Sequence, residues 1–168
     1  YILDEEGITT PEKIAYMDEL NATRNNVVAP FADKFKSAKF FAGEKSWVVP
    51  CDIAMTCAIQ NELDGKYAEM LVKNGVQYVV EVSNMGCTAD AVAVLQNANV
   101  NFAPGKAANA GGVATSGLEM SQNAMHLSWT AKEVDEKLHG IMNSIHDNCV
   151  KHGTEKNGYI NYVKGANI

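Results

Sequence analysis

Segments with strand-like and helix-like patterns alternate through the middle of the chain. Apolar and β-branched residues dominate residues 48–55, 78–82 and 100–103, which we predict to be strands. Between them, residues 64–73 and 88–97 carry apolar positions at helical spacing. A β-α-β-α-β order is typical of a parallel sheet with helices on its faces. The pattern therefore predicts an α/β fold with a doubly wound, mostly parallel sheet.

Helices are expected on both sides of this region. Near the start of the chain, Thr9 and Glu12 have the spacing of a capping box, which predicts that a helix begins there. A second, short helix is expected over residues 31–36. After the third strand, a turn rich in Gly and Ala over residues 104–112 leads into a helix that runs towards Leu127.

The last predicted helix has the clearest signals in the sequence. Thr130 and Glu133 have capping-box spacing, and Trp129 with Val134 fits a hydrophobic staple. The apolar positions that follow share one helical face; they are Val134, Leu138, Ile141, Met142 and Ile145. The chain is expected to be loop-like from Gly153 and extended over residues 159–163.

Composition and charge limit the classes of protein to which the chain can belong. With 46% apolar and 20% charged residues, the 168-residue chain is expected to be soluble and globular. A net charge of −6 without a cluster of Lys and Arg argues against nucleic acid as a partner. No apolar run approaches the length of a membrane span, so no membrane partner is expected.

The cysteines give no sign of a metal site. Cys51, Cys57, Cys87 and Cys149 form no Cys-x-x-Cys pair, and no His pair has metal-ligand spacing. Scattered single cysteines suit a reducing compartment, so a cytoplasmic location is expected.

Amide and hydroxyl side chains follow each of the three predicted strands. Gln60 and Asn61 come after the first strand, Ser83 and Asn84 after the second, and Asn109 after the third. In open parallel sheets, ligands bind beyond the carboxyl ends of the strands, where these side chains would meet. An amide both donates and accepts hydrogen bonds, as does the carboxamide of a nicotinamide ring, so the pattern indicates a site for such a ring. The alternative is that Asn and Ser occur here because they favour turns.

Two glycines after the third strand indicate a second binding element. Gly111 and Gly112 allow backbone to approach a ligand closely, and a helix beginning there presents free N–H groups to an anion. Ser116 would add a hydroxyl donor for a carboxylate; the alternative is an ordinary glycine turn. Lys106 in the same loop would be a general base only if its pKa were depressed. Neither G-x-G-x-x-G nor a P-loop pattern is present.

Two carboxylates fall inside apolar strand patterns. Asp52 lies in the first predicted strand and Glu81 in the second. A buried carboxylate must be hydrogen-bonded, so a structural role is expected for each, with a ligand-binding role as the alternative.

Six stretches of the sequence carry the residues of one known family. They are KFFAGEKSW over 39–47, CDIA over 51–54, CAIQNE over 57–62, APGKAANAGGVATSGLEMSQN over 103–123, LSW over 127–129 and GANI over 165–168. In these stretches the chain resembles the hexameric bacterial-type glutamate dehydrogenases. The resemblance covers essentially the whole chain, and residues 103–123 carry it most specifically.

The resemblance implies an oxidoreductase of known chemistry. The family interconverts L-glutamate and 2-oxoglutarate plus ammonia, with NADP or NAD as coenzyme, and the resemblance favours NADP. It implies a homo-hexamer for the parent protein. It also implies a partial Rossmann-type coenzyme domain over residues 1–129, followed by a truncated C-terminal helical segment over residues 130–168.

Site residues are implied position by position. Ser116 matches the serine that holds the side-chain carboxylate of glutamate, and Val113 lines the same pocket. Asn84 and Asn109 match asparagines near the nicotinamide and the substrate. The segment that includes Ala58 and Gln60 matches one beside the coenzyme ribose.

The chain departs from the family pattern at the first two strand ends. Thr56 stands where the family often has Pro, and Ile59 where it often has Thr, so a contact at residue 59 must use the backbone. Residues 82–86 read VSNMG instead of the common GANMP. Asn84 is kept, but the turn around it differs.

The family's catalytic residues are expected outside this chain. The chain begins at Tyr1 without an initiator Met and stops at Ile168 without a polar tail, so both ends look cut from a longer polypeptide. The resemblance puts the catalytic lysine, the catalytic aspartate and the glycine-rich phosphate loop before Tyr1, and a final helix after Ile168. We therefore expect no catalytic residue in this C-terminal fragment, and no activity from it alone.

Two other functions fit the same pattern. A sister dehydrogenase acting on Leu, Val or Phe would need an apolar pocket, whereas Ser116 is polar. A non-catalytic binding domain could keep the Rossmann-like fold.

Overall fold

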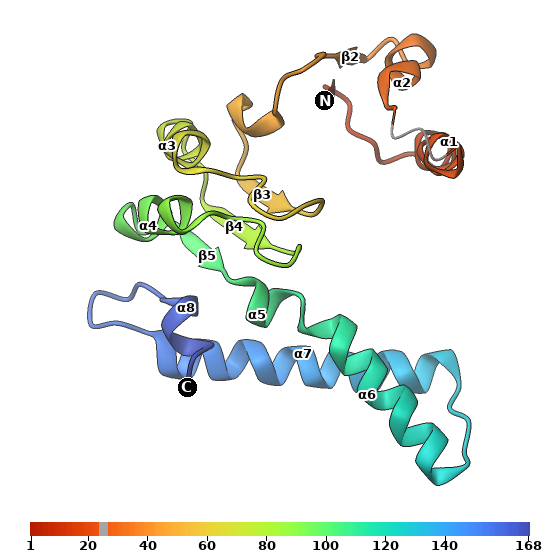
Figure 1. Ribbon diagram of the computed structural model, residues 1–168, viewed down its shortest axis with the longest axis vertical. Helices are drawn as coiled ribbons and strands as arrows, with labels where there is room; N and C mark the ends of the chain where they lie inside the picture. The colour runs from red at the N-terminus through yellow and green to blue at the C-terminus, as the bar shows by residue number, and fades with distance from the viewer. Residues whose placement is uncertain (24–26) are drawn as a thin grey trace. The chain divides into compact units, whose positions relative to one another are not determined.

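The computed structural model describes residues 1–23 and 27–168 and divides into two units, Tyr1–Ser46 and Trp47–Ile168. Figure 1 shows the order of the elements along the chain. The first unit combines two short antiparallel strands with two helices. In chain order these are β1 (Ile2–Asp4), α1 (Pro11–Ala22), α2 (Ala29–Lys34) and β2 (Ala38–Phe40).

The start of α1 corrects the predicted capping box. Thr10, rather than Thr9, caps the helix: its side chain accepts a hydrogen bond from the backbone N–H of Lys13 at 3.3 Å. Pro11 then takes the first helical position, where its missing N–H costs nothing. The strands β1 and β2 were not predicted, because three-residue strands carry too little pattern.

An ion pair is enclosed within this first unit. Nζ of Lys13 lies 2.7 Å from Oδ2 of Asp4, and the two side chains are only 6% and 1% exposed. The same ammonium group donates to the carbonyl of Gly7 and to the hydroxyl of Ser37, both at 3.1 Å. These bonds tie α1 to the loop after β1 and to the residue that precedes β2.

The second unit contains a parallel three-stranded sheet and most of the helices. After the 3-10 turn η1 (Ser46–Val48), the elements in chain order are β3 (Ile53–Thr56), α3 (Gly65–Lys73), β4 (Tyr78–Glu81), α4 (Ala89–Asn97), β5 (Asn101–Ala103), α5 (Gly105–Ala108), α6 (Ala110–Met125), α7 (Ala131–Gly153) and α8 (Tyr162–Gly165). The strands lie in the order β3-β4-β5 and all pairs are parallel. The predicted α/β class with a β-α-β-α-β order is confirmed.

The first strand of this sheet is shorter than predicted. Residues 48–52 do not join the ladder, and Ser46–Val48 form the 3-10 turn instead. Pro50 has no N–H to donate to a neighbouring strand, so the ladder begins only at Ile53. The helix and strand boundaries predicted for the rest of the sheet are correct to within one residue.

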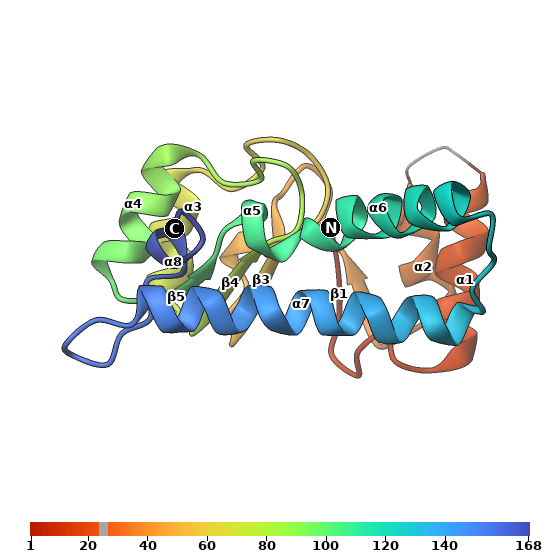
Figure 2. The ribbon, with the colours of Figure 1, turned by 90° about the horizontal axis from the view of Figure 1, so that it is seen from below.

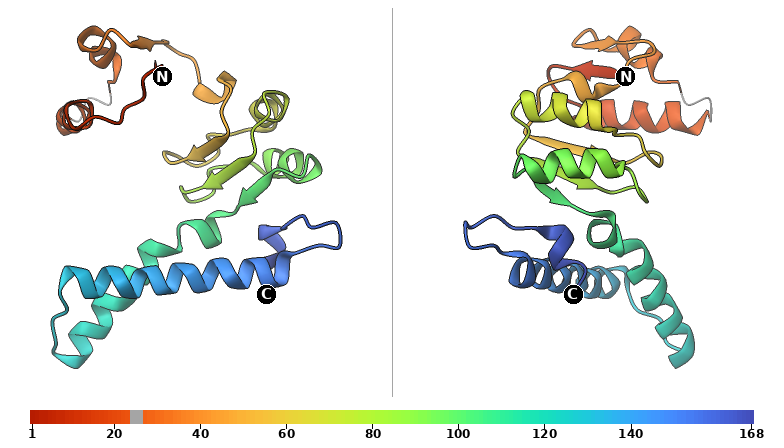
Figure 3. Two further views of the ribbon diagram at one scale, coloured as in Figure 1. Left: turned by 180° about the vertical axis from the view of Figure 1, so that it is seen from behind. Right: turned by 60° about the vertical axis from the view of Figure 1, so that its left-hand side comes forward.

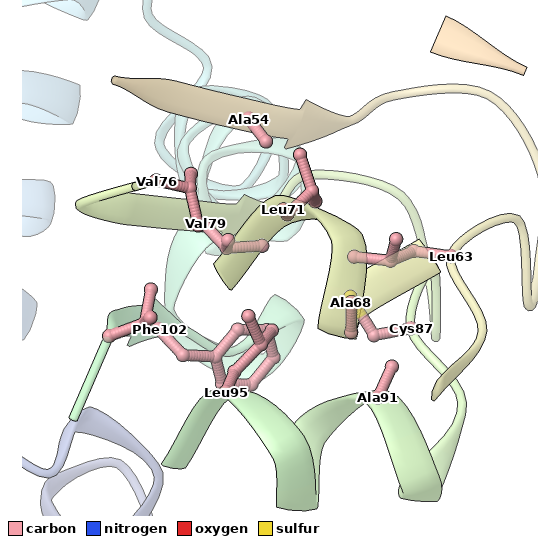
Figure 4. Close-up of a cluster of buried hydrophobic side chains, with 11 residues drawn as sticks. Ala54, Leu63, Ala68, Leu71, Val76, Val79, Cys87, Ala91, Leu95 and Phe102 are labelled. Atoms are coloured by element: carbon pink, nitrogen blue, oxygen red, sulfur yellow. The ribbon is translucent and has the colours of Figure 1, made fainter. Parts of the chain in front are cut away.

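The core of the second unit lies between the sheet and the helices α3 and α4. Leu71 of α3, Leu95 of α4, Val79 of β4 and Phe102 of β5 are at most 2% exposed and belong to one cluster (Figure 4). On the other face of β3, Ile53 and Met55 remain more than half exposed because strand side chains alternate between faces.

The long helix α7 packs beside α6 (Figure 2). Its predicted capping box is confirmed: the N–H of Thr130 donates to Glu133 Oε2 at 2.7 Å, and the N–H of Glu133 donates to Thr130 Oγ1 at 3.3 Å. The predicted apolar stripe is half-buried. A Cβ placed on Gly111 would lie 3.7 Å from Sδ of Met142 and 3.9 Å from Cδ1 of Leu138, so α7 crosses the first turn of α6 there.

The end of the chain folds back on α7 as a short helix. Residues 159–163 were expected to be extended, but Tyr162–Gly165 form α8, which lies against α7 (Figure 3). Gly165 makes this contact possible, because a side chain there would come within 2.8 Å of the Cα of Cys149. Among the described residues, no helix is both long enough and apolar enough to cross a membrane.

Candidate functional site

The loops that follow β3 and β4 are joined by backbone hydrogen bonds at the carboxyl edge of the sheet. The N–H of Ser83 donates to the carbonyl of Thr56 at 2.8 Å, directly after the two strands end. Further along, the N–H of Asn61 donates to the carbonyl of Met85 at 2.8 Å, and the N–H of Leu63 to that of Gly86 at 3.0 Å. Residues 57–62 and 82–87 therefore form one continuous surface beyond the sheet.

Gly86 is required where these two loops meet. A Cβ at this position would overlap the hydroxyl groups of Thr56 and Ser83 and would lie 2.7 Å from the Cβ of Thr56. Thr56 is fully buried, and neither hydroxyl has a hydrogen-bond partner among the described residues. The family pattern has Pro at position 86. In this chain Gly86 has no side chain, so the hydroxyl groups of Thr56 and Ser83 pack directly against its backbone.

Glu81, the last residue of β4, is buried and accepts two backbone hydrogen bonds. Oε1 accepts from the N–H of Cys87 at 2.9 Å, and Oε2 accepts from the N–H of Gly105 at 2.7 Å. The carboxylate thus meets the expectation that a buried acid is hydrogen-bonded. Asp52 does not meet it, because this residue is exposed and its contact with Gln77 is long, at 3.4 Å.

The thiol of Cys87 lies beside this carboxylate and is not a nucleophile at neutral pH. Burial, followed by the negative charge of Glu81, raises the pKa of Cys87 to about 12. A thiol with such a pKa stays protonated, and only the thiolate form is reactive.

Two of the candidate amides from separate strand ends are in contact. Nδ2 of Asn109 donates to Oδ1 of Asn84 at 2.9 Å, although the residues are 25 positions apart in sequence. Asn109 lies between α5 and α6, and its side chain caps neither helix. Within the described part of the chain, the side-chain NH₂ group of Asn84 and the side-chain oxygen Oδ1 of Asn109 have no hydrogen-bond partner.

Helix α6 continues from this amide pair with Val113 and Ser116. These residues follow Asn109 by four and seven positions, so they share one helical face with it. Val113 is 74% exposed, and the hydroxyl of Ser116 donates only a long bond, 3.4 Å, to the carbonyl of Gly112. Because α6 begins at Ala110, Ser116 lies in its second turn, about 10 Å along the axis from Asn109.

The predicted helix begins at the glycines. Gly111 and Gly112 are the second and third residues of α6, so their N–H groups are among the first of the helix, and that of Gly112 donates to the carbonyl of Asn109 at 3.2 Å. Gly111 also makes the crossing with α7 possible.

Ala58 and Gln60 lie on the neighbouring loop and are exposed. The N–H of Ala58 is already bonded to Oε1 of Glu62 at 3.0 Å. The side chain of Ile59 is 68% exposed. The loop thus presents an apolar tip and the amide of Gln60 beside the segment that carries Asn84.

Lys106 belongs to a different part of the surface. Its Nζ donates to Oδ1 of Asn167 at 2.9 Å, and it lines a hollow of about 420 Å³ together with His152 and Cys149. Asn84, Asn109 and Ser116 do not line this hollow. Among the described residues, no group of three or more His, Cys, Asp or Glu side chains is arranged to hold a metal ion.

Comparisons with known proteins agree over the whole chain. The family described as Glutamate/Leucine/Phenylalanine/Valine dehydrogenase matches residues 1–168. A Bacteroides fragilis protein named NAD-specific glutamate dehydrogenase is 61% identical over 168 residues, which are 100% of this chain and 38% of the relative. A Salmonella typhi protein named NADP-specific glutamate dehydrogenase is 53% identical over 167 residues, 99% of this chain and 37% of the relative.

Solved structures give the same result. A structure titled glutamate dehydrogenase matches with a TM-score of 0.91 and 49% identity, covering 99% of this chain and 37% of that chain. The chain therefore spans less than two fifths of the length of the proteins that it matches.

Proposed function

The chain belongs to the family of glutamate, leucine, phenylalanine and valine dehydrogenases, and from this we propose that it is part of an NAD(P)-dependent glutamate dehydrogenase. The full-length enzyme, in which the chain is joined to the remaining length that its relatives have, oxidises L-glutamate to 2-oxoglutarate and ammonia, reversibly. The observation that carries this proposal is the contact between Asn84 and Asn109 at the carboxyl edge of the sheet, with Ser116 further along the same helical face.

The free groups of the amide pair fit a nicotinamide ring. One bond within the pair leaves one NH₂ group and one carbonyl oxygen available, and exchanging the roles of the two amides leaves the same set. A carboxamide offers the complementary oxygen and NH₂ group. Asn84 and Asn109 therefore hold and orient the ring, and the bound coenzyme supplies the hydride acceptor.

Ser116 and Val113 supply the glutamate contact in this proposal. The long bond from Ser116 to Gly112 is easily replaced, so the hydroxyl can donate to the side-chain carboxylate of glutamate. Val113 lies one turn before it and lines the same pocket. A Leu, Val or Phe substrate would offer that hydroxyl no acceptor to replace the long bond to Gly112, which disfavours the sister dehydrogenases.

Ala58 and Gln60 face the coenzyme ribose in this proposal. Since Glu62 takes the N–H of Ala58 and Ile59 has no polar side-chain atom, the amide of Gln60 makes the polar contact. The relatives include both NAD-specific and NADP-specific enzymes, so identity does not choose between the two, and NADP remains our prediction from the resemblance alone.

Proton transfer is the work of residues elsewhere in the full-length enzyme. At the described sheet edge, the carboxylate of Glu81 is occupied by two backbone N–H groups, and the thiol of Cys87 is protonated. We therefore assign proton transfer to neither of them. We propose that the lysine and the aspartate that the resemblance implies lie in the part of the enzyme outside this chain.

The test is a comparison of the full-length enzyme with this chain alone. We expect the full-length enzyme to reduce NAD or NADP with glutamate at a kcat/KM far above that for leucine, valine or phenylalanine, and the 168-residue chain to be inactive. Light scattering is expected to give a hexamer for the full-length enzyme. A preference for an apolar amino acid, no activity with any of them, or turnover by the chain alone would contradict the proposal.

A further inference from the structure

We propose that Glu81 is a positioning residue for the nicotinamide site: its two carboxylate oxygens fix the two loops that carry Asn84 and Asn109. The ligand named in this inference rests on the proposed function. We call the two hydrogen bonds from the N–H groups of Cys87 and Gly105 to the Glu81 carboxylate the clamp. Its geometry does not rest on the proposed function, because it follows from the backbone contacts of one buried side chain.

Each oxygen of Glu81 holds one of the two loops. Oε1 accepts from Cys87, which closes the loop that contains Asn84. Oε2 accepts from Gly105, the first residue of α5, and Asn109 directly follows the end of that helix. The carboxylate therefore joins the end of β4 to both partners of the amide pair.

A carboxylate suits this position better than an amide. In the described part of the chain, Glu81 has no ion pair, so the two N–H groups are the contacts that compensate for the burial of its charge. A Gln side chain offers one oxygen and one NH₂ group. The NH₂ group would face one of the two N–H donors, and that loop would lose its contact.

Gly105, whose N–H donates to Oε2 of Glu81, also has close neighbours. A Cβ placed on Gly105 would lie 3.1 Å from Oε2 of Glu81 and 3.2 Å from Nδ2 of Asn109. A side chain there would move the carboxylate or the amide by a few tenths of an ångström, so glycine best suits the close approach of α5 to both groups.

Loss of the clamp would affect the coenzyme more than glutamate. Asn84 and Asn109 can still bond to each other, but their position relative to the sheet is released, and a displacement of about 1 Å costs up to about a hundredfold in rate. Ser116 lies two turns further along α6, so it is further from the two hydrogen bonds of Glu81 than Asn109 is.

The experiment uses Glu81→Gln in the full-length enzyme. We expect kcat to fall and the coenzyme KM to rise, each about tenfold, while the glutamate KM changes less than about twofold. Glu133→Gln is the matched control: it makes the same change at the start of α7, where one side-chain oxygen is enough to accept from Thr130, and neither KM should change. In an Asn84→Ala/Asn109→Ala background, Glu81→Gln should have less than about a twofold further effect, since the pair through which it acts is gone.

Three results would overturn the inference. The first is wild-type kinetics for Glu81→Gln, and the second is an equal rise in the coenzyme KM and the glutamate KM. The third is that Glu81→Gln changes kcat and the coenzyme KM by the same factor in the Asn84→Ala/Asn109→Ala background as in the wild-type enzyme. If Glu81→Gln does not fold, Gly105→Ala tests the same clamp with the carboxylate intact, and an unchanged coenzyme KM would then refute it. An inactive wild-type enzyme would instead refute the proposed function, and with it the ligand.

Discussion

Asn84 and Asn109 lie 25 positions apart in sequence, and a 2.9 Å hydrogen bond joins their side chains beyond the carboxyl edge of the sheet. Each follows a different strand, so the contact depends on β4 and β5 being parallel neighbours. The bond pairs one donor with one acceptor and leaves one of each exposed. The pair is therefore both a structural contact between two loops and a surface that can receive a carboxamide.

Removing one amide of this pair tests its role in coenzyme binding. Asn84→Ala in the full-length enzyme is expected to raise the coenzyme KM about tenfold, because a typical hydrogen bond contributes about 1 kcal/mol and Asn109 loses its partner as well. Asn97→Ala at the far end of α4 is the control and should leave the KM unchanged. Equal coenzyme KM values for both variants and the wild type would rule the role out.

Ser116 is predicted to determine the affinity for glutamate. Ser116→Ala should raise the glutamate KM about tenfold to a hundredfold, since a hydrogen bond to a charged group contributes about 1.5–3 kcal/mol, and should leave the coenzyme KM within about twofold. Ser121→Ala is a matched control. That serine lies on the same helix and donates to the carbonyl four residues earlier, at 2.8 Å, but it does not share the face of Ser116. If the two variants had the same kinetics, Ser116 would have no special role.

Gly86 is predicted to contribute strongly to stability. Gly86→Ala forces a methyl group onto the hydroxyls of Thr56 and Ser83 and should destabilise the protein by about 1–3 kcal/mol or more, seen as a lower Tm. Gly140→Ala in α7 should raise stability by about 0.5–1 kcal/mol, because nothing lies within 4 Å of the added carbon and Ala favours a helix. A Gly86→Ala variant as stable as the wild type would show that the loops rearrange freely.

Thiol labelling should distinguish the cysteines. At pH 8, the pKa of about 12 leaves only about one Cys87 thiol in ten thousand as thiolate, and the residue is 4% exposed, so it should resist iodoacetamide in the native protein. Cys57, which is exposed on the loop after β3, should be labelled first. Mass spectrometry of the peptides would reveal the order, and early modification of Cys87 would contradict the buried position described above.

The ion pair in the first unit predicts a dependence of stability on pH. Its hydrogen bond to Lys13 holds the pKa of Asp4 below the ordinary value, so the pair stabilises above the unfolded pKa of about 3.9 and its contribution is lost as pH falls through the lower, folded value. Contact with Asp4 raises the pKa of Lys13, so a second loss follows as pH rises through that raised value, above about 10.4.

Asp4→Asn should therefore lower Tm by several degrees at pH 7 and by much less near pH 3. Glu5→Gln is the matched control, because the pair between Glu5 and Lys39 at 3.0 Å is exposed on both sides and should contribute almost nothing. Equal Tm differences for Asp4→Asn at the two pH values would contradict this account.

Much of the second unit could be predicted from local pattern. The capping box at Thr130 was found from spacing alone, because the two residues satisfy each other within one turn of helix. Tyr78–Glu81 was found because a buried parallel strand is a nearly continuous apolar run. The short helix α8 at the end of the chain was not predicted. It depends on the backbone of Gly165 lying against Cys149, and no local pattern encodes a contact between positions 16 residues apart.

By itself, the sequence determined the α/β class, the order of strands and helices within the parallel sheet, and the residue types at the strand ends, because periodicity and capping are properties of neighbouring residues. Only the tertiary structure decided that Asn84 meets Asn109, that Glu81 rather than Asp52 is the buried acid, and that Gly111 serves a helix crossing. Those facts depend on the parallel pairing of β4 with β5 and on the packing of α7 against α6. Both bring together groups that are far apart in the chain.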